Sequence, residues 1–178
     1  MEFVLIGYFP KKVASRPAWL QAPAVREICS VSECIATGPE GWISRWAHNE
    51  LWMYDSEQLA ESVIPAAARA DAFRLYAYRL LPILFRAGAQ EPFEVPRLTP
   101  HPLPATFASL GFDVVSRSVG TAFECSPLSC NGMATQFEVN EHCLVPTPEG
   151  AVEFARWCAD EEPEPGPYVV VEVLRRRP

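Results

Sequence analysis

The amino-acid sequence predicts an α+β fold: a single compact domain of two α/β halves around a mixed or antiparallel sheet. Two observations carry this prediction. Short apolar or alternating runs, which are typical of strands, occur along the whole chain and are separated by helix signals. The spelling Cys-Ser-x-x-x-Cys also occurs twice, at 29–34 and 125–130, and each copy is followed by an Asn-Glu pair and then by a helix start.

This weak internal repeat predicts how the domain, residues 1–178, is divided. Residues 17–98 and 104–174 are the expected pseudo-symmetric halves. The segment 92–104 joins them, because its five prolines are typical of a stiff connection. A chain of 178 residues that is 49% hydrophobic is large enough to bury a core without metal or disulfide bonds.

The elements of the first half begin with residues 3–9, a continuous apolar run closed by Pro10, which predicts a buried strand. Residues 25–31 alternate between apolar and polar and predict a half-buried strand. Aromatic residues four positions apart predict a helical turn at 42–46, and residues 51–54 are expected to form a short strand.

Two helices are predicted next. Asp55 or Ser56 is a suitable cap for the first, with Glu57 in its first turn. Apolar residues at spacings of three and four predict a long helix over 66–87, kinked at Pro82.

The second half is expected to begin after a possible edge strand at 93–95. Residues 105–110 are predicted to be a short helix, followed by strands at 112–116 and 137–145. Pro148 suits the first position of a helix over 149–159, and the β-branched run 168–174 predicts a last strand.

The charge and the absence of certain segments exclude several classes of protein. A formal net charge of -7 and a pI near 5.0 disfavour general binding to nucleic acid or to an anionic membrane surface. No run of about 18 apolar residues is present, so we expect no membrane span. The N-terminal apolar run precedes its lysines, the reverse of a signal peptide, so the sequence predicts a cytoplasmic protein with reduced thiols.

Four cysteines are the candidate metal ligands. Cys29, Cys34, Cys125 and Cys130 would suit tetrahedral zinc if the two cysteine segments met. The four residues between paired cysteines present both sulfurs less reliably than the usual two, so packing of the thiols in the core or in loops, and disulfide bonds, are alternatives. No cofactor is otherwise expected, and zinc is the one that these residues fit.

A cysteine nucleophile is a second hypothesis. Cys125 or Cys130 would attack, His142 would act as the base, and Asn140 would orient the imidazole from the same face of a strand. A chance proximity of Cys and His in the sequence is the alternative, since none of the known local spellings of cysteine hydrolases is present.

Four further residues are candidates for contact with a partner. Trp42 and Trp46 would form one face of a helical turn, and Arg79 and Arg86 would share a face of the predicted long helix. Core packing of the tryptophans and ordinary surface pairing of the arginines are the alternatives.

The function predicted first is binding to another protein, as an accessory, regulatory or inhibitor subunit. This hypothesis rests on the absence of the common nucleotide-binding, hydrolase and zinc-protease motifs and on the many tryptophans and prolines. A cysteine-nucleophile hydrolase or transferase is the first alternative, and a zinc-stabilised binding module is the second.

Overall fold

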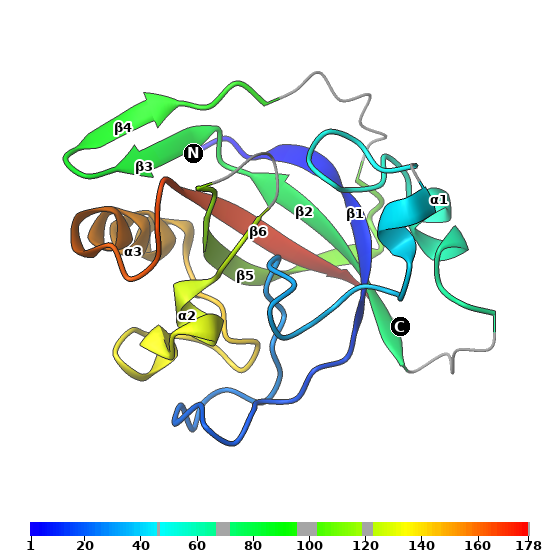
Figure 1. Cartoon of the computed structure of the whole chain (residues 1–178), viewed down its shortest axis with the longest axis horizontal. Coiled ribbons are helices and arrows are strands. Elements are labelled where there is room, and N and C mark those ends of the chain that lie inside the picture. Colours follow the sequence, from blue (N-terminus) through cyan, green and yellow to red (C-terminus); the bar gives the residue numbers. More distant parts are fainter. Residues whose placement is uncertain (46, 67–71, 96–102, 119–122, 178) are drawn as a thin grey trace.

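The computed structural model describes residues 1–45, 47–66, 72–95, 103–118 and 123–177, and in this part of the chain one antiparallel sheet of six strands forms the centre (Figure 1). Its strands are β1 (Val4–Lys12), β2 (Phe73–Leu80), β3 (Ile83–Arg86), β4 (Ala89–Pro92), β5 (Phe107–Ser116) and β6 (Tyr168–Arg176). Strand β6 pairs with β2, β3 and β5, and β1 pairs with β2. The predicted α+β class with a mixed or antiparallel sheet is therefore confirmed.

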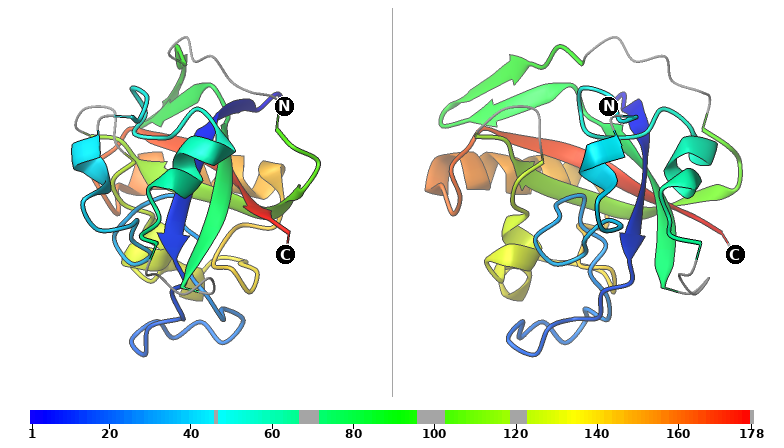
Figure 2. Two further views of the ribbon diagram at one scale, coloured as in Figure 1. Left: turned by 90° about the vertical axis from the view of Figure 1, so that its right-hand side faces the viewer. Right: turned by 45° about the vertical axis from the view of Figure 1, so that its right-hand side comes forward.

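Three helices and two 3-10 turns accompany the sheet in the described residues. The helices are α1 (Glu57–Ser62), α2 (Pro127–Cys130) and α3 (Pro148–Glu161), and the 3-10 turns are η1 (Trp42–Arg45) and η2 (Met133–Thr135). Helix α3 packs against β3, β5 and β6, whereas α1 packs against β1 and β2 at the opposite end (Figures 1 and 2). The core is accordingly divided into two apolar clusters, one around β1 and β2 and the other beneath α3.

The first strand, the capped helix near residue 57 and the last two elements agree with the sequence prediction. Ser56 caps α1 and accepts a hydrogen bond from the backbone N–H of Leu59, and Thr147 does the same for α3 with Gly150. Each cap satisfies an amide that has no partner inside the helix.

The predicted long helix over 66–87 is wrong. Residues 67–71 lie outside the described part, and strands β2 and β3 occupy the rest, separated by Leu81 and Pro82. Both faces of β2 are buried, so its apolar residues need not alternate with polar ones, and a short apolar run does not distinguish helix from strand. Arg79 and Arg86 therefore lie on two different strands and share no helix face.

Other segments also differ from the prediction. Residues 105–110, expected to be helical, include the beginning of β5. Residues 25–31, 51–54 and 137–145 form no ladder and take part only in isolated bridges, and β4 ends before 93–95. In 25–31 and 137–145, whose alternating polarity predicted strands, turns and isolated bridges place the buried apolar side chains.

One of these turns is built around Asn140. Its Nδ2 donates to the carbonyl of Leu110 in β5 at 2.6 Å, and its Oδ1 accepts from the backbone N–H groups of His142 and Leu144. Gly111 makes the approach possible, because a Cβ there would lie 2.9 Å from Asn140 Nδ2, and its φ of 135° is unfavourable for other residues.

Asn49 makes the corresponding contacts against β1. Its Nδ2 donates to the carbonyl of Ile6, and its Oδ1 accepts from the N–H groups of Leu51 and Met53. Gly7, with φ of 137°, allows the approach, since a Cβ there would lie 2.6 Å from Met53 Cβ. Each asparagine thus ties an irregular turn to a strand.

Replacing either asparagine should destabilise the fold to a similar degree. Asn49→Ala or Asn140→Ala leaves two N–H groups and one carbonyl without their partner, which we expect to cost about 2 kcal/mol or more in the free energy of unfolding. Urea denaturation measures the loss. Asn131→Ala is the control. The side-chain amide of Asn131 donates an exposed hydrogen bond to the Pro163 carbonyl, so its loss should change the free energy of unfolding by less than about 0.5 kcal/mol. A loss no larger than the control would contradict this role.

Candidate metal centre

The site begins with a buried lysine at the end of β1. The side chain of Lys11 is inside the protein, and its Nζ donates to the carbonyls of Ser30 and Val31, at 2.8 Å each, and of Ser32. Burial lowers the pKa of Lys11 to about 8, so the ammonium group is still mostly charged at neutral pH. This one side chain fixes the backbone of the first cysteine segment, residues 29–34.

Asp113 in β5 joins the first cysteine segment to the second, residues 125–130. Its Oδ2 accepts from Ser30 Oγ at 2.6 Å and from the N–H of Val31 at 2.9 Å, and its Oδ1 accepts from Ser126 Oγ at 2.6 Å. Burial raises the pKa of Asp113, while these hydrogen bonds and the charge of Lys11 oppose the shift. The carboxylate therefore holds both cysteine segments in fixed positions on one side of the sheet.

Three thiols meet as a result. The Sγ atoms of Cys34 and Cys125 are 3.4 Å apart, and those of Cys34, Cys125 and Cys130 all lie within 4.8 Å of one another. A tetrahedral ion with bonds of about 2.3 Å to sulfur would place its sulfur ligands about 3.8 Å apart. We call these residues the thiol centre, and a metal ion fits it after small movements of the side chains.

The protonation of the thiol centre is uneven. Hydrogen bonds from Cys130, then Ser32 and Cys125, lower the pKa of Cys34 to about 5. Burial and the neighbouring Cys34 thiolate raise the pKa of Cys125 to about 11, and the same thiolate raises that of Cys130. The contacts among the three sulfurs thus favour the loss of one proton from the centre and oppose the loss of the others, which a metal ion would have to displace.

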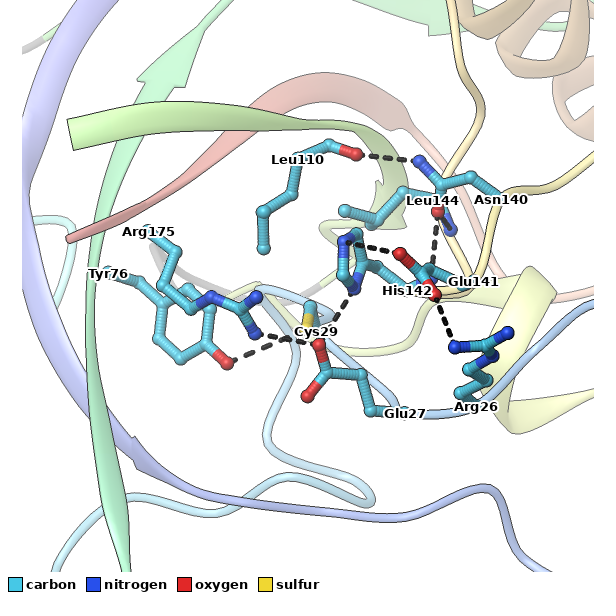
Figure 3. Close-up of polar contacts among 10 residues, drawn as sticks. All are labelled: Arg26, Glu27, Cys29, Tyr76, Leu110, Asn140, Glu141, His142, Leu144 and Arg175. Carbon is cyan, nitrogen blue, oxygen red and sulfur yellow. Dashed lines mark hydrogen bonds and ion pairs between the residues drawn. The ribbon is translucent and has the colours of Figure 1, made fainter. Parts of the chain in front are cut away.

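Cys29, the fourth predicted metal ligand, lies in a different cluster (Figure 3). It is buried, and its Sγ is 3.5 Å from the hydroxyl of Tyr76. Its ligand atom lies within 4.8 Å of those of Glu27 and His142. Burial raises the pKa of Cys29 to about 12, so this thiol stays protonated. The structure thus brings together three of the four predicted ligands.

His142 and Asn140, predicted as base and orienting residue, are engaged elsewhere. His142 Nδ1 lies 2.7 Å from Glu27 Oε1, and the same oxygen lies 2.6 Å from Arg175 (Figure 3). The amide of Asn140 binds the backbone N–H of His142 and not its imidazole. Cys125 and Cys130 have Cys34 as their close titratable neighbour, while His142 belongs to the Glu27 cluster.

An apolar pocket of about 360 Å³ adjoins the thiol centre, and Cys34 belongs to its lining. Aromatic side chains form much of the wall, namely Phe9, Trp42, Trp52 and Phe123. Trp42 was predicted as an exposed recognition residue; it is half-buried, and its ring meets Phe9 and Trp52 edge-on at 4.7 and 6.0 Å. Trp46 lies outside the described residues.

The two predicted partner-binding arginines form ion pairs within the chain. Arg79 lies 2.8 Å from Glu172 in the neighbouring strand β6, and Arg86 lies 3.2 Å from Glu91 across the β3–β4 hairpin. Arg86 and Glu91 are both exposed, so their ion pair contributes little to stability, whereas Arg79 is half-buried and pairs with the buried Glu172.

Sequence analysis missed the residues that build the site, Lys11, Asp113 and Glu27. A signal was present for Asp113, since a charge within the apolar run Phe112–Ser116 suggests a buried polar contact. Lys11 resembles a surface lysine in sequence, and only its tertiary contacts reveal its role.

Comparison with known proteins finds no family that matches the chain, no similar curated protein and no similar solved structure. Among the described residues, no helix has the length and apolar character needed to cross a bilayer. The chemistry of the site itself is therefore the basis for inferring function.

Glu27 should make the stability of the protein depend on pH. Its contacts with His142, and then with Arg175, lower its pKa from 4.5 to about 2. Because the folded state favours the carboxylate, the stability gained is complete above about pH 4.5 and is lost as the pH falls towards 2.

The substitution Glu27→Gln should therefore lower the free energy of unfolding by about 1–3 kcal/mol at pH 6, with a difference that shrinks steadily below pH 4.5. Urea denaturation at several pH values measures this. Glu153→Gln, at an exposed position of α3, is the control. A difference that is independent of pH would show that the carboxylate charge is not responsible.

Proposed function

We propose that this chain is a metal-binding module in which Cys34, Cys125 and Cys130 hold one zinc ion. The observation that carries the proposal is the convergence of three Sγ atoms from segments about 91 residues apart. Thiolates favour soft or borderline ions, and among these zinc commonly has cysteine ligands in proteins. The ion would connect the two cysteine segments that Asp113 already positions, so little ordering is needed on binding.

A disulfide bond between Cys34 and Cys125 is the competing use of the same thiols. It would require the two sulfurs, now 3.4 Å apart, to approach to about 2.05 Å, and it would leave Cys130 unused. The presence of a third thiol in the same group favours metal. We also propose a cytoplasmic location, where thiols remain reduced.

The metal proposal predicts a specific set of effects. The reduced protein should bind about one zinc ion per chain, measured by elemental analysis after dialysis. Cys34→Ser, Cys125→Ser and Cys130→Ser should each lower the affinity about 100-fold or more, since loss of even an outer partner of a ligand commonly costs 10–100-fold.

Cys29→Ala is the matched control, because Cys29 lies in the other cluster and should not affect zinc content. If zinc is lost in Cys29→Ala but kept in Cys34→Ser, the metal binds at the cluster of Glu27, Cys29 and His142, and the proposed site is wrong. A reduced wild-type chain that binds no zinc would overturn the proposal.

We further propose that the module acts on another protein, as an accessory, regulatory or inhibitor subunit. Ile43 is 51% exposed beside the half-buried Trp42, and these two apolar side chains at the pocket form a small patch that would suit contact with a partner. The substitution Ile43→Asp should leave stability unchanged and reduce the recovery of a partner from native lysate, compared by affinity purification with wild type. Equal recovery of every bound protein would contradict the role of this patch.

We propose that the chain contains two copies of one unit, and that the first copy begins at β1, earlier than the residue 17 expected from the sequence: β1, the Asn49 turn, α1 and β2 correspond to β5, the Asn140 turn, α3 and β6. Support comes from the equivalent hydrogen bonds of the two asparagines and from a register shift next to Gly7 and Gly111. The paired alanine substitutions test it, because a large loss at one turn and none at the other would argue against equivalent units.

A further inference from the structure

We infer that the pocket beside the thiol centre binds a small molecule with an apolar, aromatic body and a neutral nitrogen donor, and that this nitrogen takes the fourth position at the metal. The inference rests on the proposed function, because without the metal the nitrogen has nothing to coordinate. It names the class of ligand that the metal module would recognise.

The pocket has the size and wall of a site for a small ligand. Its volume of about 360 Å³ is within the usual range for such sites, which are mostly apolar. Trp42 lies nearly perpendicular to both Phe9 and Trp52, at 81° and 85°, so the rings support one another and form a wall suited to a flat aromatic group.

Cys34 connects the pocket to the metal. It belongs both to the pocket lining and to the thiol centre, and its side chain is exposed. Glu124 also lines the pocket, and its backbone carbonyl oxygen lies 3.4 Å from Cys34 Sγ. A ligand held against the aromatic wall is therefore adjacent to an ion bound by Cys34.

The fourth ligand has to come from outside the described chain. No other His, Cys, Asp or Glu among the described residues joins the three thiols within the same 4.8 Å. His48, the imidazole beside the pocket tryptophans, stacks on Trp52 at 4.7 Å and is not part of the thiol centre. Three protein ligands with one open position are typical of zinc sites that accept an exogenous group.

Charge selects a neutral donor. Three thiolates around a divalent ion carry a formal charge of about −1. Glu33 and Glu124 line the pocket, and the carboxylate of Glu164 acts on Cys34 electrostatically, so an anionic ligand would meet further negative charge. A neutral aromatic nitrogen avoids this repulsion and completes the Cys₃His-type ligand set that is common for zinc.

Three probes on the cobalt-loaded full chain test the inference. 4-Phenylimidazole has both the donor and the aromatic body, imidazole has the donor alone, and 1-phenylpyrrole has the shape without the donor. The visible absorption of Co²⁺ reports coordination, and tryptophan fluorescence reports occupation of the pocket. We expect 4-phenylimidazole to change the cobalt bands with an affinity about tenfold or more above that of imidazole, because it also buries a phenyl group. 1-Phenylpyrrole should change the fluorescence alone.

The substitution Trp42→Ala removes part of the wall and should reduce the affinity for 4-phenylimidazole to that for imidazole, while the cobalt spectrum without probe stays the same. Trp19→Ala, at an exposed tryptophan outside the pocket, is the control and should change neither. Equal affinities for 4-phenylimidazole and imidazole on a cobalt-loaded chain would overturn the inference and leave the proposed function intact. A chain that takes up no cobalt would overturn both, before any probe is added.

Discussion

The buried charges of Lys11 and Asp113 are the constraint on which the rest of the site depends. Buried charges are expensive unless hydrogen bonds and an opposite charge compensate them. Here three backbone carbonyls accept from Lys11, three donors reach Asp113, and the two residues act on each other electrostatically. Except for Ser126, all of these partners belong to residues 30–32. The irregular backbone of the first cysteine segment is therefore held by these side-chain hydrogen bonds.

The two clusters of titratable groups differ in environment, and the difference decides their chemistry. Cys34 in the thiol centre is exposed and its pKa is lowered, which suits a metal ligand that has to lose its proton. Cys29 is buried, its pKa is raised, and its neighbours Glu27, His142 and Arg175 form an internal ion-pair network. The first cluster therefore has the exposure and the lowered pKa that the proposed metal site requires, while the second joins the N-terminal part of the chain to β6.

The sheet explains how distant segments reach these clusters. Strand β6 is buried over Tyr168–Leu174 and pairs on both edges, so β2 and β5 lie on either side of it. Lys11 and Asp113 are carried on β1 and β5, which pair with β2 and β6 respectively. The pocket and the thiol centre share Cys34, so metal binding and ligand binding would be coupled through one side chain.

The sequence by itself determined the fold class, the first and last strands and the two capped helices, because these depend on local signals: a short apolar run, a capping side chain and a proline at the first helical position. It also identified the meeting of the two cysteine segments as the condition for a metal site. Only the tertiary structure decided that Phe73–Leu80 and Ile83–Arg86 are strands, since burial of both faces of β2 removes the polar alternation by which a strand is recognised. Only the tertiary structure separated Cys29 from the other three thiols, because the contacts that hold the two clusters join residues far apart in the sequence, such as Ser30 with Asp113 and Glu27 with Arg175, and no local pattern encodes them.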